Sequence, residues 1–182
     1  MSINSLLTIL PAPKSPVEAP RPEDWTTIEK QIGKLPADFK TFIEQYGSGT
    51  INRFLWVLNP FSVNKHANLL KRMEPIIDAI RELKKDWPEQ HPYKLFPEPG
   101  GLLPFGGSDN GDTLFWLTVG EPDKWPIVVN AARDPDYEKF DCGMANFLVG
   151  ILTQHIHCSI FPKSFPGEAP IFAPMGVQKT SP

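Results

Sequence analysis

The run LLPFGGSDNGDTLFWLTVGEPDKWPIVV, from Leu102 to Val129, contains the strongest strand and turn signals in the sequence. Two apolar runs, 102–105 and 113–118, flank a cluster of Gly, Ser, Asp and Asn, which is the composition of a hairpin connection. Asn110-Gly111 is the predicted turn, because both residue types tolerate the positive φ of tight hairpins. A third apolar run, 127–129, follows a second turn. The stretch therefore predicts a three-stranded antiparallel meander.

Helical spacing of apolar residues predicts the elements around the meander. The helical segments are 25–32, 36–46, 64–87 and 144–155. The run 51–58 is rich in β-branched and aromatic residues and predicts a further strand. Asp141 is the predicted N-cap of the last helix, and His155 lies on its apolar stripe. These elements predict an α+β fold: a single domain with a mostly antiparallel sheet built around the meander and helices packed on one side.

The longest predicted helix contains a proline. Its apolar stripe keeps its phase across Pro75, so a kink or a local break with continued packing is expected there. The stripe consists of Leu69, Met73, Ile76, Ile80, Leu83 and Trp87. All six positions are expected to pack against the core.

Prolines mark the ends of the domain. The 21 prolines of this 182-residue chain cluster near both ends and in the segment 88–104. Residues 1–22 are predicted to form an apolar patch followed by a Pro-rich linker, and residues 23–161 the α+β domain. Residues 162–182 are predicted to be a Pro-rich tail, preceded by a short edge strand at Ile160-Phe161.

Charge narrows the class of partner. The formal net charge of −3 disfavours direct nucleic-acid binding, since that affinity depends on Lys and Arg. Acidic residues concentrate in the predicted turns and in the connection 131–141. They are Asp109, Asp112, Glu121, Asp123, Asp134, Asp136, Glu138 and Asp141. A negative field on one side of the molecule would suit a basic protein partner, and an ordinary solvated face is the alternative.

The number of cysteines and the N-terminal segment indicate the cellular compartment of the protein. Cys142 and Cys158 are too few for a disulfide framework. The N-terminus lacks the basic segment and the long apolar run of a signal peptide or membrane span. A cytoplasmic protein without membrane association is expected.

No metal or cofactor site is predicted. Walker, dinucleotide-binding, nucleophile-elbow and zincin motifs are absent. The cluster 109–112 lacks the alternating oxygen ligands and the terminal Glu of a calcium loop. His155, His157, Cys158 and Cys142 are competent zinc ligands, but their spacing matches no zinc motif, and His155 is expected in the core.

Catalysis is not predicted either. Asp109 with Asp134 or Glu138 would be the candidate pair for a carboxylate hydrolase, which needs two positioned acids with separated pKa values. Surface acids in turns explain these residues equally well. No catalytic residue is therefore assigned.

Several segments, in this order and spacing, resemble the SUKH superfamily, specifically its Smi/Knr-like branch. They are LPADFKTFIEQYGSG (35–49), FLWVLNPF (54–61), YKLFPEPGGLLPFGGSDNGDTLFWLT (93–118), DKWPIVV (123–129) and FDCGMANFLVGIL (140–152). The resemblance implies a single α+β domain. For most bacterial members it implies an immunity protein that binds and blocks a toxin made by the same cell, often a nuclease. The residues that match the recurrent core of the motif are Gly106, Asp109, Asn110, Gly111, Asp112, Trp116 and Trp125.

Resemblance and charge together give a functional hypothesis. Acidic turns are expected to dock a cationic cleft on a cognate protein toxin. The predicted partner-binding residues are Asp109, Asp112, Asp134, Asp136 and Glu138. Phe54 and Trp56 are the alternative aromatic anchors. A regulatory scaffold with its Pro-rich segments as handles and a small enzyme with an acid-lined pocket are the competing classes.

Overall fold

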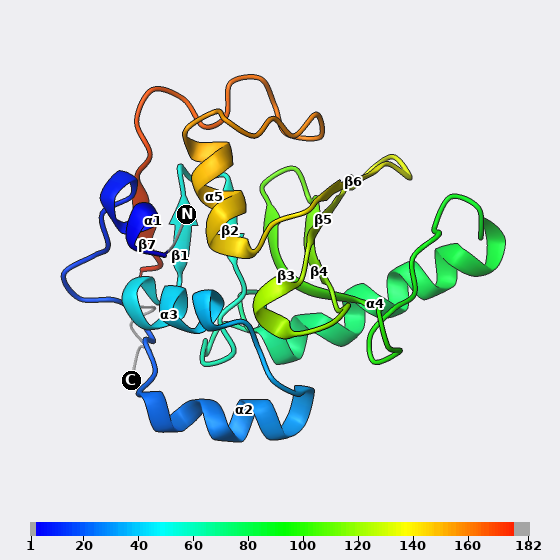
Figure 1. Ribbon diagram of the computed structural model, residues 1–182, viewed down its shortest axis with the longest axis horizontal. Coiled ribbons are helices and arrows are strands. Elements are labelled where there is room, and N and C mark those ends of the chain that lie inside the picture. The colour runs from blue at the N-terminus through cyan, green and yellow to red at the C-terminus, as the bar shows by residue number, and fades with distance from the viewer. Residues whose placement is uncertain (1–2, 177–182) are drawn as a thin grey trace, which may run out of the picture.

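Seven antiparallel strands form one sheet through the molecule (Figure 1). The computed structural model describes residues 3–176 and confirms the predicted α+β class. The helices are α1 (Ile3–Ile9), α2 (Trp25–Ile32), α3 (Ala37–Tyr46), α4 (Leu69–Asp86) and α5 (Met144–Leu152), with short 3₁₀ helices η1 (Pro22–Asp24) and η2 (Pro122–Lys124). The strands are β1 (Gly49–Ile51), β2 (Leu55–Val57), β3 (Leu102–Ser108), β4 (Thr113–Leu117), β5 (Ile127–Asn130), β6 (Tyr137–Phe140) and β7 (Phe172–Pro174). Their order across the sheet is β6-β5-β4-β3-β2-β1-β7.

The predicted meander is confirmed as β3, β4 and β5. The register places Leu103 opposite Trp116 and Trp116 opposite Ile127, so these three side chains share one face of the sheet. β3 contains an irregularity between Pro104 and Gly106, where its pairing with β4 shifts by one residue. The meander therefore supplies the centre of the sheet.

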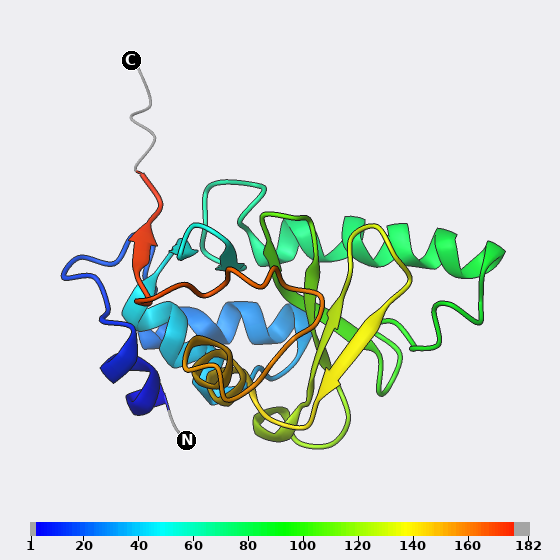
Figure 2. The same cartoon turned by 90° about the horizontal axis from the view of Figure 1, so that it is seen from above.

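Hydrophobic side chains pack on both faces of the sheet. On the first face, α1, α2, α3 and α5 contribute to the core around Trp116, which stacks on Phe105 at a centroid distance of 4.6 Å and meets Phe39 edge-on at 4.9 Å. On the second face, Ile77 and Ile80 of α4 pack against the meander. The prediction had all helices on one side of the sheet, whereas α4 covers the face opposite to the other helices (Figure 2). Successive apolar residues in the central strands require this second cover.

The run 51–58 forms two strands instead of the one predicted. The chain reverses at Asn52 and Arg53, which adopt φ values of 49° and 54°. The backbone N–H of Asn52 donates to the carbonyl of Ile171 at 2.8 Å, and the N–H of Ile171 donates to Asn52 Oδ1 at 2.5 Å. Because the partner lies 119 residues further along the chain, local composition did not reveal the turn.

The two edge strands also lie outside the predicted positions. β6 occupies the segment 131–141 that was predicted to be a connection. β7 pairs with β1, whereas no strand forms at Ile160-Phe161. Both edge strands are short and partly exposed, so they lack the apolar alternation that marks a buried strand. The end of the predicted tail, 177–182, lies outside the described residues.

α4 continues through Pro75 without a break in its helical assignment. Its stripe packs on the sheet as far as Ile80. Beyond that point Leu83 and Trp87 are 42% and 50% exposed, contrary to the expectation that the whole stripe is covered.

The first turn of α5 is capped from another helix. Gly143, not the predicted Asp141, is the N-cap residue, and Asp38 Oδ2 of α3 accepts a hydrogen bond from the N–H of Ala145 at 2.8 Å. Burial raises the pKa of Asp38, and the neighbouring carboxylate of Asp123 raises it further. Tertiary packing thus replaces the local cap.

Gly106→Ala is expected to destabilise the protein by about 1–3 kcal/mol. The added Cβ would lie 2.6 Å from the backbone oxygen of Trp56, and β2 cannot move away without losing its pairing with β3. Denaturant unfolding measures the change. Gly176→Ala, where a Cβ would meet no atom of residues 3–176 within 4 Å, is the matched control. Equal stability of the two variants would contradict the close approach.

Asp38→Asn is expected to remove a pH dependence of stability. Because the pKa of Asp38 is raised in the fold, the folded protein binds more protons than the unfolded chain. The wild type therefore loses stability as the pH rises from 3.8, the ordinary pKa of Asp, through the higher pKa of the folded state. The amide keeps an acceptor for Ala145 and has no such loss. Asp38→Ala lacks the acceptor and should be about 1 kcal/mol less stable than Asp38→Asn. Urea unfolding across acidic pH tests both, and parallel profiles for wild type and Asp38→Asn would disprove the assignment.

Candidate functional site

Two turns lie together at one end of the sheet, here called the turn end: residues 108–112 between β3 and β4, and residues 131–136 between β5 and β6. The carboxylate of Asp112, which is 5% exposed, joins them. Ser108 Oγ donates to its Oδ2 at 2.5 Å, and the N–H of Ala132 donates to its Oδ1 at 3.1 Å. Hydrogen bonds from both turns to one buried carboxylate fix their relative position.

Three of the predicted partner-binding residues are exposed at the turn end. Asp109 lies in the first turn, and Asp134 and Asp136 lie in the second. Within residues 3–176 none of the three takes part in an ion pair. Their negative charge is therefore available to a partner.

The remaining acidic residues have other positions. Glu138 lies in β6 and accepts hydrogen bonds from the N–H and the hydroxyl of Ser159, at 2.8 and 3.1 Å. Glu121, Asp123 and Asp141 lie in the connections at the opposite end of the sheet, because the β4–β5 and β6–α5 connections leave from there. The acidic residues of 109–141 thus divide between two ends.

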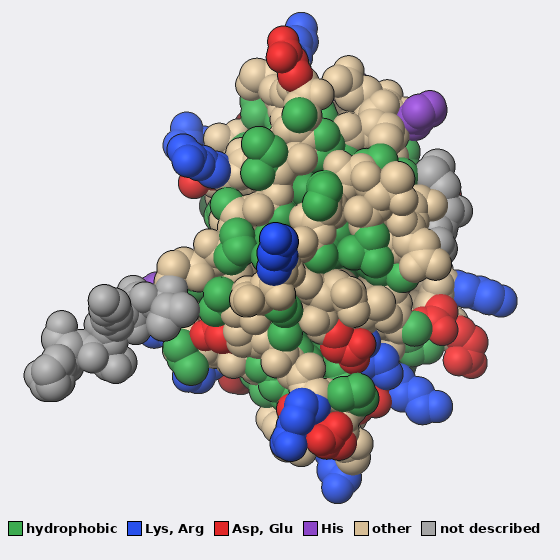
Figure 3. Space-filling view, turned by 90° about the vertical axis from the view of Figure 1, so that its left-hand side faces the viewer, with side chains coloured by type: hydrophobic (Ala, Val, Ile, Leu, Met, Phe, Trp, Pro, Cys, Tyr) green, Lys and Arg blue, Asp and Glu red, His purple; other side chains and the backbone are tan. Residues whose placement is uncertain are grey.

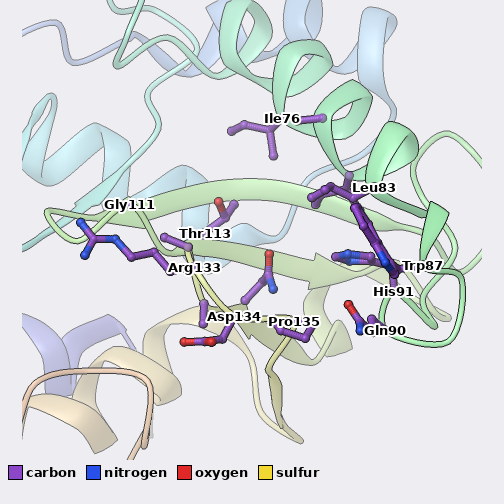
Figure 4. A pocket seen from close by; sticks show the side chains of 15 residues that line it. Ile76, Leu83, Trp87, Gln90, His91, Gly111, Thr113, Arg133, Asp134 and Pro135 are labelled. Atoms are coloured by element: carbon purple, nitrogen blue, oxygen red, sulfur yellow. The ribbon is translucent and has the colours of Figure 1, made fainter. Parts of the chain in front are cut away.

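Three hollows surround the turn end and share lining residues. The largest, about 440 Å³, lies between α4 and the turn 131–136 (Figure 4). A second, about 390 Å³, is lined by acids of both turns, and a third, about 160 Å³, lies between Trp56 and Asp109. None of the three is lined by Asp109 together with Asp134 or Glu138, the pair that hydrolysis would need.

The largest of the three hollows is here called the α4 groove, and the sequence did not assign a binding role to any of the residues named below. Leu83 and Trp87 form its α4 wall, and Arg133 stands on the opposite rim. His91 Nδ1 lies 2.8 Å from the hydroxyl of Tyr137 at one end of the groove. Burial lowers the pKa of His91, and the nearby charge of Lys84 lowers it further, so its neutral form is favoured. The only sequence signal for this groove was the stripe that continues to Trp87.

Most of the family-motif residues have structural roles. Trp116 is fully buried, and Trp125 is buried with its Nε1–H donating to the carbonyl of Gly120 at 3.1 Å. Gly111 adopts a positive φ of 93° in the first turn. Asn110 is exposed beside it.

The two alternative aromatic anchors differ in their surroundings. Phe54 packs against Phe161 and Phe165, with ring centroids 5.6 and 4.7 Å away. Trp56 is partly exposed and its indole lies over Gly107, where a Cβ would come within 3.2 Å of the ring. Both therefore border the turn end: the carbonyl of Phe54 accepts a hydrogen bond from the N–H of Asp109 at 2.8 Å, and Trp56 lines a hollow together with Asp109.

The candidate zinc ligands are not assembled into a site. Between residues 3 and 176, no group of three or more His, Cys, Asp or Glu side chains is arranged to hold a metal ion. α5 ends at Leu152, so His155 lies beyond it and is exposed, not in the core as predicted. Cys158 is buried, and burial raises its pKa to about 12.

A family model described as "SUKH_6: SMI1-KNR4 cell-wall" matches residues 22–148, more than half of the chain. This chain belongs to the SUKH superfamily. The matched region of this SUKH protein starts at η1 and ends within α5, so it contains the meander and the whole turn end but not α1 or β7. Neither a curated protein nor a solved structure matches the chain. In the described part of the protein, no helix has the length and apolarity needed to cross a membrane.

Asp112→Ala is expected to destabilise the protein by about 1–3 kcal/mol, because Ser108 Oγ and the N–H of Ala132 lose a buried acceptor. Asp109→Ala, at an exposed position, should change stability by less than about 0.5 kcal/mol. Denaturant unfolding of the two variants compares a structural acid with a surface acid in the same turn. Equal losses would contradict the separation of roles.

Proposed function

We propose that this SUKH protein is an immunity protein, which binds a cognate protein toxin and blocks it through the turn end. One observation carries the proposal: Asp109, Asp134 and Asp136 are exposed on two turns that Asp112 holds together. Unpaired carboxylates at fixed positions attract a basic surface and resemble the phosphates that a nuclease site binds. Family membership supports a non-catalytic binding role.

The fixed geometry favours binding over solvation alone. Side chains and loops that must be ordered on binding reduce affinity, and the hydrogen bonds of Asp112 order these turns beforehand. The face around α1 and β7 has another character: hydrophobic and uncharged surface covers much of it, a basic side chain stands near its centre, and its acidic side chains are scattered among basic ones (Figure 3). That face offers no comparable acidic display.

The scaffold alternative is disfavoured by the packing of the N-terminal Pro-rich segment. Glu18 accepts hydrogen bonds from Ser48 Oγ at 2.5 Å and from the N–H of Val63 at 2.8 Å. Val17 forms a bridge with Gly47. A segment held against the domain is not free to enter a polyproline-binding groove of another protein.

Replacing Asp109, Asp134 and Asp136 together by Lys is expected to lower affinity for the toxin by about 100-fold or more, mainly through slower association. The probes are toxin domains encoded by genes adjacent to this one, purified in inactive form and tested by surface plasmon resonance. Survival of cells that co-express the active toxin gives a second readout.

Glu121→Lys is the control, since it makes the same charge reversal as each single substitution of the triple variant, on an exposed residue at the opposite end of the sheet. It should leave affinity and survival unchanged. Undiminished toxin binding by the triple variant would refute the proposed surface.

A further inference from the structure

The apolar stripe of α4 continues past the part of the sheet that it covers. Ile77 and Ile80 are buried on the second face, whereas Leu83 and Trp87 are 42% and 50% exposed. Figure 1 shows the C-terminal half of α4 projecting beyond the strands. Exposed apolar side chains that lie together beside polar groups are typical of surfaces that bind another molecule.

The α4 groove has the length of a short helix. Ile76 and Trp87 are the first and last α4-side residues that line it, and at about 1.5 Å per residue they are roughly 16 Å apart along the axis. Asn130 and the turn 131–136 line the other side of the groove. Figure 4 shows Arg133, Asp134 and Pro135 of this turn across from α4. The groove is open to solvent along Leu83 and Trp87, so it would not enclose a small molecule, which usually loses most of its surface to a pocket.

Two opposite charges stand on the turn 131–136 at one end of the groove, where the Arg133 side chain extends toward Gly111 (Figure 4). Arg133 and Asp134 are both exposed, and within residues 3–176 neither takes part in an ion pair. Asp134 also lines the neighbouring acidic hollow, so the groove is continuous with the turn end. An occupant that complements these two charges carries a basic and an acidic side chain beside its apolar stripe.

We infer that the α4 groove seats a short amphipathic helix of the partner protein. Apolar residues at helical spacing on that helix pack against Ile80, Leu83 and Trp87, while a Lys or Arg pairs with Asp134 and an Asp or Glu pairs with Arg133. The inference rests on the proposed function and names the element of the partner that the groove recognises. Apolar anchoring here adds to the electrostatic contact at the turn end.

The first test selects binders from a phage-displayed library of helical peptides of about 15 residues, a length that spans the groove. The full chain is the bait. Enriched peptides are expected to share an apolar stripe with a basic and an acidic residue beside it. Selection against the charge-swapped variant, Arg133→Asp with Asp134→Arg, should exchange the positions of those two charges.

The second test measures affinities of the selected peptides by fluorescence anisotropy. Leu83→Asn and Trp87→Ser should each weaken binding about tenfold or more. Both residues are exposed, so their replacement leaves the core intact, and unchanged thermal unfolding verifies this. Val119→Asn, at a 56% exposed apolar residue in the β4–β5 connection, is the control and should bind normally.

The inference is overturned if no enriched peptide depends on Leu83 and Trp87. It is also overturned if sedimentation shows a wild-type dimer that Trp87→Ser dissociates, because a second copy of the chain would then fill the groove. The groove and the proposed function can fail separately. The groove alone is refuted if toxin binding is lost on charge reversal of the turn end but is unaffected by Leu83→Asn and Trp87→Ser. The immunity role alone is refuted if peptides bind the groove but no toxin binds the protein.

Discussion

Burial of Trp116 between the sheet and α3 is the contact on which the rest of the structure depends. Its indole is inaccessible to solvent, stacked on Phe105 and edge-on to Phe39. A one-residue slip of β4 would move this ring to the face covered by α4 and leave its position in the core unfilled. Packing of one aromatic side chain therefore fixes the β3–β4 register, and the register fixes where the turn 108–112 stands.

The turn end shows how burial separates the roles of chemically identical residues. Asp112 faces inward and uses its carboxylate to join two turns, whereas Asp109, three positions earlier, presents the same group to solvent. A buried carboxylate must find donors, and here those donors come from both turns. The ordered turns hold the exposed carboxylates of Asp109, Asp134 and Asp136 at fixed positions, which favours electrostatic recognition of a partner.

α4 connects the core with the proposed binding surface. Ile80 packs in the second core and also lines the groove, while Leu83 and Trp87 continue the same helical stripe into solvent. The groove wall is consequently an extension of a packed helix and needs little ordering before a partner binds. The His91–Tyr137 contact braces the segment after α4 against β6.

The sequence by itself determined the meander, the main helices and the family, because these depend on turn chemistry and on apolar spacing within short segments. Tertiary structure alone decided features whose partners are distant in the chain. Ile171 completes the hairpin at Asn52, and Asp38 caps α5. Tertiary structure also decided that Asp109, Asp134 and Asp136 lie together at the turn end. Periodicity placed Leu83 and Trp87 on the apolar stripe, but these two residues are exposed because the sheet ends before them. The spacing of apolar residues in a helix does not show how far the surface that it packs on extends.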